Sequence, residues 1–325
     1  MGAVRHTTDP VQAAWALAAG HLAALPTETV YGLGALADRP HAIARVYAAK
    51  GRPADHPLIV HVRGVKALTA WATDTPDYAH ALAAAFWPGP LTLVLPRTAR
   101  AGDFVTGGQD TVALRVSSHP DFVRVLDILA GLTRDGHVGV AAPSANRFGQ
   151  VSPTTSAHVT AELAGRLDGN DVVLDGGPSS VGVESTIVDC TGPAPVILRP
   201  GHVSRHDVER VTGLAVAGSS AVRAPGTLAS HYAPAARVQI VDAAALAARP
   251  DGDATVGVLA PAGVPTPEGH VRLSEPRTTE EYAQVLYAAL READALELTA
   301  VLVVPPSPEG VGAAVIDRLT RAAHG

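Results

Sequence analysis

Short apolar runs alternate with helical stretches from the N-terminus to about residue 212. This alternation is typical of an α/β domain, in which helices cover a sheet of strands. Several helical stretches open on proline, which suits a first helical turn, and Ser204 is placed to cap a last helix through Val211. The expected strands are 22–25, 58–62, 91–95, 112–116, 138–141, 172–174, 185–189 and 196–198, and the expected helices are 40–50, 76–86, 120–129 and 156–166.

A second α/β pattern follows a stretch that has no periodicity. The chain has 325 residues, whereas single domains usually have roughly 100 to 200, so two domains are expected. We predict a first domain at residues 1–212, a linker at 213–236 and a smaller second domain at 237–325. The longest helix of the second domain should begin at Thr278, whose spacing to Glu281 is that of a capping box. Its expected strands are 238–241, 255–259 and 300–304.

Composition and charge exclude several classes of protein. Apolar residues make up 47% and charged residues 17%, which is typical of globular chains and not of disordered ones. No run reaches the ~18 apolar residues of a membrane span. The net charge is −6, and neither half of the chain is basic overall, which disfavours a general nucleic-acid binder. Cys190 has no cysteine partner, so we expect it in the core, and the protein in a reducing compartment such as the cytoplasm.

The segment P-T-E-T-V-Y-G-L-G at residues 26–34 directly follows an expected strand. Thr27, Glu28, Thr29 and Tyr31 place polar side chains where open α/β sheets bind ligands. The run G-L-G-A-L-A also fits a dinucleotide fingerprint, but that fingerprint joins a strand tightly to a helix, and here the next helix begins too late. We therefore favour a polar binding loop over a plain turn or a nicotinamide site.

Lys50 and Arg52 lie on either side of Gly51, at the end of an expected helix. The chain has only two lysines, Lys50 and Lys66, against 23 arginines, so an ordinary surface cation here would have been arginine. A compact ammonium beside a planar guanidinium suits contact with a triphosphate. The alternative is that Lys50 only caps the helix C-terminus electrostatically.

Other polar residues favour binding over metal or nucleophilic chemistry. His56 and His61 lack the further ligands that zinc requires, so His61 is expected to be an interior histidine. Ser144 lacks an elbow such as G-x-S-x-G, so its segment suits hydrogen bonding to a nucleotide, or simple turn chemistry. Arg115 and Arg199 adjoin apolar runs, and each needs an internal carboxylate or a substrate anion as its partner.

These segments occur together, in a fixed order, along nearly the whole chain. They are P-T-E-T-V-Y-G-L-G, K-G-R-P, H-P-L-I-V-H, A-L-R, P-S-A-N, S-P-T, E-S-T-I-V-D, L-R-P-G and P-G-T-L-A-S-H-Y-A-P. The ordered set resembles the YrdC-like threonylcarbamoyl-AMP synthases, in their long form with an added C-terminal domain. The resemblance implies a twisted open-sheet domain and a smaller Rossmann-like α/β domain, with residues 213–236 lying across the active site.

The resemblance also implies the residues of the site. Lys50 and Arg52 match the family's paired basic residues and are expected to be catalytic. The expected L-threonine-binding residues are Thr29, His61, Arg115, Ala142 and Ser185. The expected ATP-binding residues are Arg52, His56, Thr111, Ser144, Asn146, Ser152, Arg199 and Tyr232, and no residue is expected to bind a metal directly.

The implied activity is synthesis of L-threonylcarbamoyladenylate and pyrophosphate from L-threonine, bicarbonate and ATP, for modification of tRNA beside the anticodon. Such nucleotidyl transfer depends on positioning and charge neutralisation, so the lack of a catalytic triad is expected. Mg²⁺ would be carried by the phosphates of ATP. The implied partners are a downstream tRNA threonylcarbamoyl transferase complex and, through a weak contact, tRNA itself; no membrane is involved.

Three positions depart from the family pattern. His56 stands where asparagine is expected, Ser117 follows A-L-R-V where proline is usual, and Thr227-Leu228 replaces a methionine-centred pair. The first bears on one nucleotide contact, and the other two bear on local backbone shape.

Two other functions remain as alternatives. One is a carbamoyl-transfer enzyme related to hydrogenase maturation factors, but those have zinc-binding cysteine clusters, and this chain has a single cysteine. The other is a non-catalytic RNA-binding module, which the negative net charge disfavours.

Overall fold

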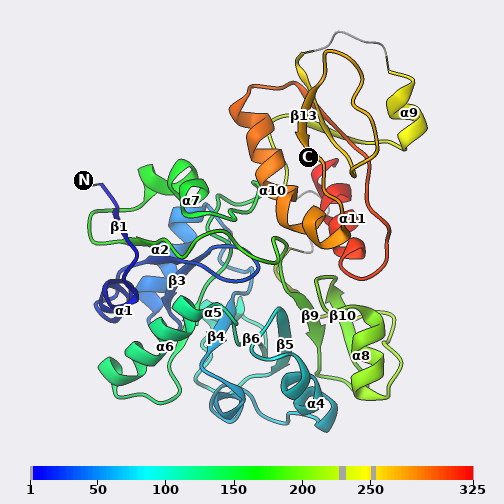
Figure 1. Cartoon of the computed structure of the whole chain (residues 1–325). Helices are drawn as coiled ribbons and strands as arrows, with labels where there is room; N and C mark the ends of the chain where they lie inside the picture. The colour runs from blue at the N-terminus through cyan, green and yellow to red at the C-terminus, as the bar shows by residue number, and fades with distance from the viewer. Residues whose placement is uncertain (1–2, 227–231, 250–253, 325) are drawn as a thin grey trace. The chain divides into compact units, whose positions relative to one another are not determined.

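The computed structural model describes residues 3–226, 232–249 and 254–324, and the chain forms two compact units (Figure 1). The first unit holds residues 3–148, 153–179 and 184–226. The second unit holds residues 149–152, 180–183 and the described residues from 232 onward. Each unit combines a sheet with helices, so the expected α/β class is confirmed.

A ten-stranded mixed sheet forms the first unit, in the order β1-β8-β2-β3-β7-β4-β6-β5-β9-β10. At its centre β4 is parallel to β6, and β7 and β5 flank this pair in the antiparallel sense. Every strand expected from the apolar runs of this domain is present, with small shifts at the ends. The strands are β1 (Arg5–Thr7), β2 (Ala23–Leu25), β3 (Gly32–Leu36), β4 (Ile59–Val62), β5 (Leu91–Pro96), β6 (Thr111–Arg115), β7 (Gly139–Ala141), β8 (Val172–Leu174), β9 (Thr186–Asp189) and β10 (Val196–Arg199).

Several helices of the first unit begin or end at capping residues. Asp9 accepts a hydrogen bond from the Val11 N–H at 2.9 Å, and Ser204 forms a capping box with Asp207. Gly51 takes the left-handed conformation just after Lys50. The helices are α1 (Pro10–Ala18), α2 (Pro40–Lys50), α3 (Leu68–Trp71), α4 (Asp77–Phe86), α5 (Asp103–Thr106), α6 (Pro120–Thr133), α7 (Ser156–Leu163) and α8 (Arg205–Thr212), with short 3₁₀ turns at Val65–Ala67 and Ala164–Arg166.

The two faces of the sheet carry separate apolar clusters. Because successive side chains of a strand point to opposite faces, Ala23 and Leu25 pack with α1 and α6, while Ala24 packs in the cluster that includes α2. Phe122 of α6 is fully buried in the first of these clusters. Burial of an aromatic or aliphatic side chain of this kind contributes about 1.5–3 kcal/mol, so these clusters hold the sheet rigid at its centre.

A third apolar cluster lies on β4, β6, β5 and β9. Its strand residues are Ile59, Val94, Ala113 and Ile187. Residues of the expected linker cover it, since Ala224 is buried there and Val222 packs against it. Residues 222–224 therefore pack back on the sheet and do not form a solvated spacer at this point.

The last three residues of the segment 26–34 belong to a strand, which corrects the prediction that the whole segment is a loop. Strand β3 starts at Gly32 and pairs with β2. A Cβ on Gly32 would lie 3.0 Å from the Ala142 Cβ, and one on Gly34 would lie 3.0 Å from Val140 Cγ1. Glycine is needed at these positions because the neighbouring backbone approaches closely. In the sequence, glycines at this spacing resemble a loop.

The second unit contains a four-stranded parallel sheet in the order β11-β14-β12-β13. The Thr278 hydroxyl caps its longest helix by accepting the Glu281 N–H at 3.1 Å, which is the first half of the capping box that the spacing indicates. The Glu281 carboxylate accepts the N–H of Arg277 and not that of Thr278, so the reciprocal half is displaced by one residue. Strand β13 and helices α9 and α11 were not predicted. The elements are β11 (Arg237–Ile240), α9 (Ala243–Ala247), β12 (Val256–Leu259), β13 (Val271–Ser274), α10 (Thr279–Ala295), β14 (Ala300–Val303) and α11 (Gly312–Ala322).

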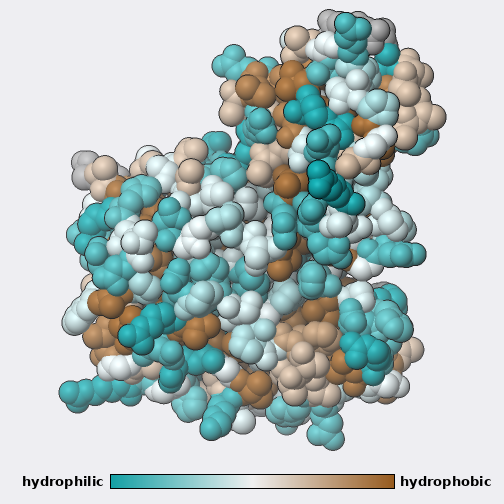
Figure 2. Space-filling model, viewed as in Figure 1, coloured by the Kyte–Doolittle hydropathy of each residue, from teal (hydrophilic) through white to brown (hydrophobic). Residues whose placement is uncertain are grey.

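Hydrophilic residues are interspersed with hydrophobic ones over the face of the molecule that Figure 2 shows. Scattered apolar side chains on a surface of this kind are normal for globular proteins. Among the described residues, no helix is both long and apolar enough to span a membrane.

Candidate functional site

Polar side chains on neighbouring strands share one face of the first unit's sheet. His61 of β4 lies opposite Arg115 of the parallel strand β6, and Thr92 of β5 also lies opposite Arg115. Paired residues project from the same face of a sheet. His61 and Arg115 stand at the carboxyl ends of their strands, where open α/β sheets bind ligands.

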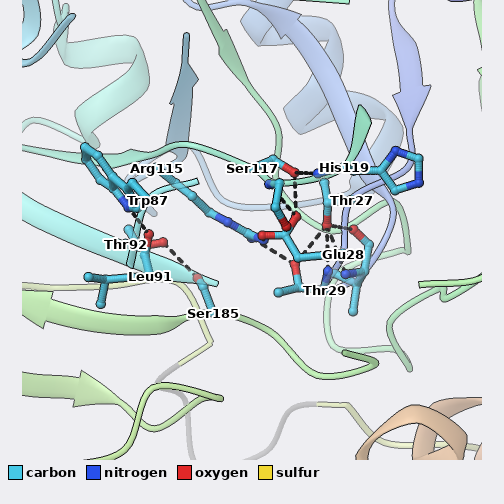
Figure 3. A network of polar contacts seen from close by, with 12 residues as sticks. Thr27, Glu28, Thr29, Trp87, Leu91, Thr92, Arg115, Ser117, His119 and Ser185 are labelled. Carbon is cyan, nitrogen blue, oxygen red and sulfur yellow. Dashed lines mark hydrogen bonds and ion pairs between the residues drawn. The ribbon is translucent and has the colours of Figure 1, made fainter. Parts of the chain in front are cut away.

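Arg115 is held by two residues of the loop that follows β2 (Figure 3). Its Nη2 lies 2.8 Å from Glu28 Oε1, and its Nη1 donates to Thr29 Oγ1 at 2.8 Å. The side chains of Arg115 and Glu28 are only 5% and 6% exposed. An internal carboxylate therefore accompanies Arg115, which was one of the two partners that the sequence left open.

Thr27 fixes the role of the Thr29 hydroxyl. Thr27 Oγ1 donates to the Val30 carbonyl at 2.6 Å, and it lies 2.9 Å from Thr29 Oγ1. A hydroxyl has one hydrogen to donate, so Thr29 must donate to Thr27 and accept from Arg115. The loop is thus organised so that a lone pair of Thr29 faces the guanidinium.

Glu28 is ionised in the folded protein. Burial alone would raise the pKa of Glu28, but the charge of Arg115 and the hydrogen bond from Ser117 lower it to about 2. Because this pKa lies below the ordinary value of 4.5, the interaction stabilises the fold above that pH, and the stabilisation is lost as the pH falls through about 2.

His61 is an interior histidine, as expected, and it packs beside the ring of Phe122 at a centroid distance of 4.8 Å. Burial and the nearby Arg115 lower the pKa of His61 to about 3, and the opposing effects of Glu28 and the Val140 backbone are smaller. The ring is therefore neutral at physiological pH. Within the described part of the chain, the two ring nitrogens of His61 have no hydrogen-bond partner. The same holds for Nε and Nη2 of Arg115, although Nη2 forms the ion pair with Glu28.

Ser185 extends this polar row toward β9. Its hydroxyl lies 2.8 Å from Thr92 Oγ1 and accepts from Arg199 Nη2 at 3.1 Å. Arg199 Nε and Nη2 also donate to the Ser185 carbonyl, at 3.1 and 3.0 Å, and Nη1 donates to the Pro225 carbonyl at 3.0 Å. Arg199 thus ties the start of β9 to the linker segment.

Lys50 is buried, at 3% exposure, and binds the segment that follows β7. Its Nζ donates to the carbonyls of Ser144 and Asn146, at 2.5 and 2.6 Å, and its own carbonyl accepts from the Phe148 N–H at 2.8 Å. Burial, reinforced by the charge of Arg52, lowers the pKa of Lys50 well below its usual range. The structure therefore gives Lys50 a direct contact with the S-x-N segment, which the sequence analysis did not foresee.

Arg52 and His56 meet around Phe148. The guanidinium of Arg52 lies 5.8 Å from the ring centroid of Phe148, and the ring of His56 contacts the same ring edge-on at 5.3 Å. Arg52 Nη2 also donates to the Pro57 carbonyl at 3.0 Å. Burial, then the charge of Arg52, lowers the pKa of His56.

The remaining expected residues do not all join these groups. The Ala142 N–H donates to the Ile59 carbonyl at 3.1 Å, next to the strands that carry His61 and Arg115. Thr111 opens β6 and lies roughly 13 Å from Arg115 along the strand. Ser152 and Tyr232 belong to the second unit, and Thr227-Leu228 lies outside the described residues.

Tyr232 is 1% exposed within the second unit. Its ring lies between the guanidinium of Arg318, at 5.3 Å, and the ring of Tyr287, at 5.7 Å. Its φ of 63° is in the left-handed region, which is unusual for tyrosine and shows that the surrounding packing fixes the backbone there.

Comparison with known proteins assigns the family. A family model described as "Telomere recombination" matches residues 15–201, and one described as "Threonylcarbamoyl-AMP synthase, C-terminal domain" matches residues 203–324. A threonylcarbamoyl-AMP synthase of Pyrococcus abyssi is 38% identical over 93% of this chain and 90% of its own length. A Bacillus subtilis protein of the same name is 37% identical over 98% of this chain and 94% of its own length. The chain belongs to the threonylcarbamoyl-AMP synthase family.

A solved structure supports this membership and the fold. The crystal structure of P. abyssi Sua5 complexed with L-threonine superposes with a TM-score of 0.83 and 37% identity, over 99% of this chain and 96% of that one. The ordered motifs of the sequence therefore identified the threonylcarbamoyl-AMP synthase family correctly.

Sequence reasoning gave no role to Glu28 or Thr92, although both contact residues of the expected threonine set. Glu28 was noted only as part of a polar loop. One signal for Glu28 was available. An arginine at the end of an apolar strand requires an anionic partner, and Glu28 is a carboxylate in the polar segment 26–34, which also follows a strand. Thr92 gave no signal, since threonine is common in strands.

Proposed function

We propose that this protein makes L-threonylcarbamoyladenylate and pyrophosphate from L-threonine, bicarbonate and ATP, as the activated intermediate for modification of tRNA beside the anticodon. Membership of the family supports this proposal, and so does the relative that was crystallised with L-threonine. The observation that carries it is the pair His61 and Arg115, which present buried nitrogens without partners on one face of the sheet. Buried donors are normally satisfied, so such a pair points to a polar ligand.

The reaction needs no nucleophile from the protein. The threonine amine attacks the carbon of bicarbonate, water leaves, and a carbamate forms. A carbamate oxygen then attacks the α-phosphorus of ATP, and the bond from that phosphorus to the pyrophosphate oxygen breaks. The protein's contribution is to hold the two reactants in line and to neutralise charge.

In this scheme, Arg115 binds the threonine carboxylate and neutral His61 hydrogen-bonds the same substrate, with Thr29, Ala142 and Ser185 completing the threonine site. Neutral His61 offers one donor and one acceptor, which suits the hydroxyl or amine of threonine without adding charge. A guanidinium matches a carboxylate by its planar fork of donors.

ATP enters as its Mg²⁺ complex. We assign the ion to the phosphates of ATP and to water, because Mg²⁺ in nucleotide sites is held largely by these ligands. We propose that Arg52 neutralises the phosphate charge of ATP. Lys50 would hold the S-x-N segment in position to bind the nucleotide. The other residues assigned to ATP by the resemblance are His56, Thr111, Ser144, Asn146, Ser152, Arg199 and Tyr232.

The product would pass to the tRNA threonylcarbamoyl transferase complex of the cytoplasm. We also propose a weak contact between this protein and tRNA, because the threonylcarbamoyl group is finally transferred to tRNA.

Residues 213–236 are proposed to lie across the active site. Within the first unit, Ala224 covers the face that carries Arg115, and Pro225 binds Arg199. We expect truncation after Val211 to reduce synthesis strongly, since it also removes Ala224 from the apolar cluster of the first unit. We expect saturating ATP with threonine to slow proteolysis between residues 224 and 234. If cleavage there is as fast with both substrates as without them, and the truncated protein keeps full activity, the segment is only a tether.

The substrate requirement gives the test of the function. We expect release of pyrophosphate to need both L-threonine and bicarbonate, because the nucleophile is the carbamate that they form together. The measurement is pyrophosphate release with each component omitted in turn. Equal release without threonine, or in carbonate-depleted buffer, would rule out the proposed reaction.

A further inference from the structure

Glu28 is a buried carboxylate that the proposed reaction does not otherwise use. Its Oε2 accepts hydrogen bonds from the Ser117 hydroxyl at 2.5 Å and from the Ser118 N–H at 3.2 Å. Its Oε1 lies 2.8 Å from Arg115 Nη2 and, among the described residues, has no hydrogen bond of its own. The two oxygens therefore have different roles, because one fixes the carboxylate and the other faces the guanidinium (Figure 3).

Ser117 is itself oriented toward Glu28. Its Oγ accepts the His119 N–H at 3.2 Å, and since a hydroxyl has one hydrogen, that hydrogen is directed to Glu28. His119 is the N-cap residue of α6, where its Nδ1 accepts the Asp121 N–H at 3.3 Å. Glu28 is thereby connected to the start of a 14-residue helix.

We propose that Glu28, held in place by Ser117, is the positioning residue that orients the guanidinium of Arg115 toward the carboxylate of threonine. This inference rests on the proposed function. The guanidinium donates to Thr29 through Nη1 and forms an ion pair with Glu28 through Nη2, which fixes its plane. Neither Nε nor Nη2 makes a hydrogen bond within the described residues, so this edge of the guanidinium can offer a ligand two N–H groups. Two-point recognition of a carboxylate requires such a fixed fork.

A purely structural ion pair gives a different expectation. It would contribute to stability, and its loss would leave threonine affinity unchanged in molecules that remain folded. Arg45 and Asp171 provide a matched control, because Arg45 Nη2 also lies 2.8 Å from a fully buried carboxylate that accepts a backbone N–H, that of Leu22. Asp171 directly precedes β8 and Arg45 lies on α2, so that pair stands at the amino end of β2, away from the threonine residues.

The experiment compares Glu28→Gln with Asp171→Asn in the full-length protein. Each variant keeps the side-chain shape and removes the charge. We expect Glu28→Gln to raise the Kd for L-threonine, measured by titration calorimetry, at least about tenfold, and Asp171→Asn to change it by less than about twofold. The KM for ATP should stay within about twofold of wild type in both. Glu28→Asp, which restores the charge on a shorter arm, should recover part of the affinity.

An unchanged threonine Kd in Glu28→Gln, or an equal rise in Asp171→Asn, overturns the proposal. If Glu28→Gln does not fold, Ser117→Ala takes its place: removal of the hydroxyl should raise the threonine Kd about threefold, and no change would refute the positioning role. Failure of the wild-type protein to bind threonine contradicts the proposed function itself, and so is distinguishable from failure of this inference.

Discussion

Arg115→Ala is expected to raise the KM for L-threonine by about 10- to 100-fold, which corresponds to the ~1.5–3 kcal/mol of a charged, two-pronged hydrogen bond. The KM for ATP should change by less than about twofold. The physical reason is that Arg115 lies in register with His61 and presents two nitrogens, Nε and Nη2, that make no hydrogen bond within the described residues. Steady-state kinetics with each substrate varied in turn give the measurement.

The control for this variant is Arg45→Ala, which removes an arginine from another carboxylate at the same 2.8 Å distance. Removal of Arg115 leaves Glu28 buried without its cation, at a cost in stability of roughly 3–5 kcal/mol. The double variant Arg115→Ala with Glu28→Gln relieves that cost and should still have the raised threonine KM. A change confined to the ATP KM would show that Arg115 serves the nucleotide.

Lys50→Ala is expected to lower turnover at least about tenfold, or ~1.4 kcal/mol of barrier, in a protein that still folds. Without the ammonium, the carbonyls of Ser144 and Asn146 lose a buried donor, so the segment assigned to the nucleotide loosens. A cation that only caps the helix would cost ~0.3–1 kcal/mol of stability and leave activity near normal.

Lys66→Ala is the matched control for this prediction, because Lys66 is exposed and is the only other lysine of the chain. Its turnover should equal that of the wild type. Wild-type turnover in Lys50→Ala, together with a small loss of thermal stability, would decide for the helix-end role.

The sequence predicted elements whose signals are local. Helix α2 runs from Pro40 to Lys50, as the proline at its start and the glycine after its end indicate. Strand β3 was missed because its alternating glycines look like a turn, although they reflect close contact with β2 and β7. Strand β1 was missed because Arg5–Thr7 is polar and lies at the edge of the sheet.

The site was predictable only in part, because its contacts join residues that are far apart in the sequence. Glu28 and Arg115 are brought together by the strand order β2-β3-β7-β4-β6, and a single sequence does not specify that order. The same holds for Lys50, whose partners follow β7. The motifs located the polar segments, and the sheet topology decides which of them touch.

The central claim is that the protein itself joins threonine, bicarbonate and ATP into one molecule. The most direct test is to incubate it with ATP, Mg²⁺, L-threonine and isotopically labelled bicarbonate, and to analyse the products by mass spectrometry. We predict threonylcarbamoyl-AMP, a mixed anhydride of the carbamate and AMP whose carbamate carbon carries the bicarbonate label, together with pyrophosphate. Consumption of ATP to AMP or ADP with threonine unmodified and no labelled adenylate would contradict the account.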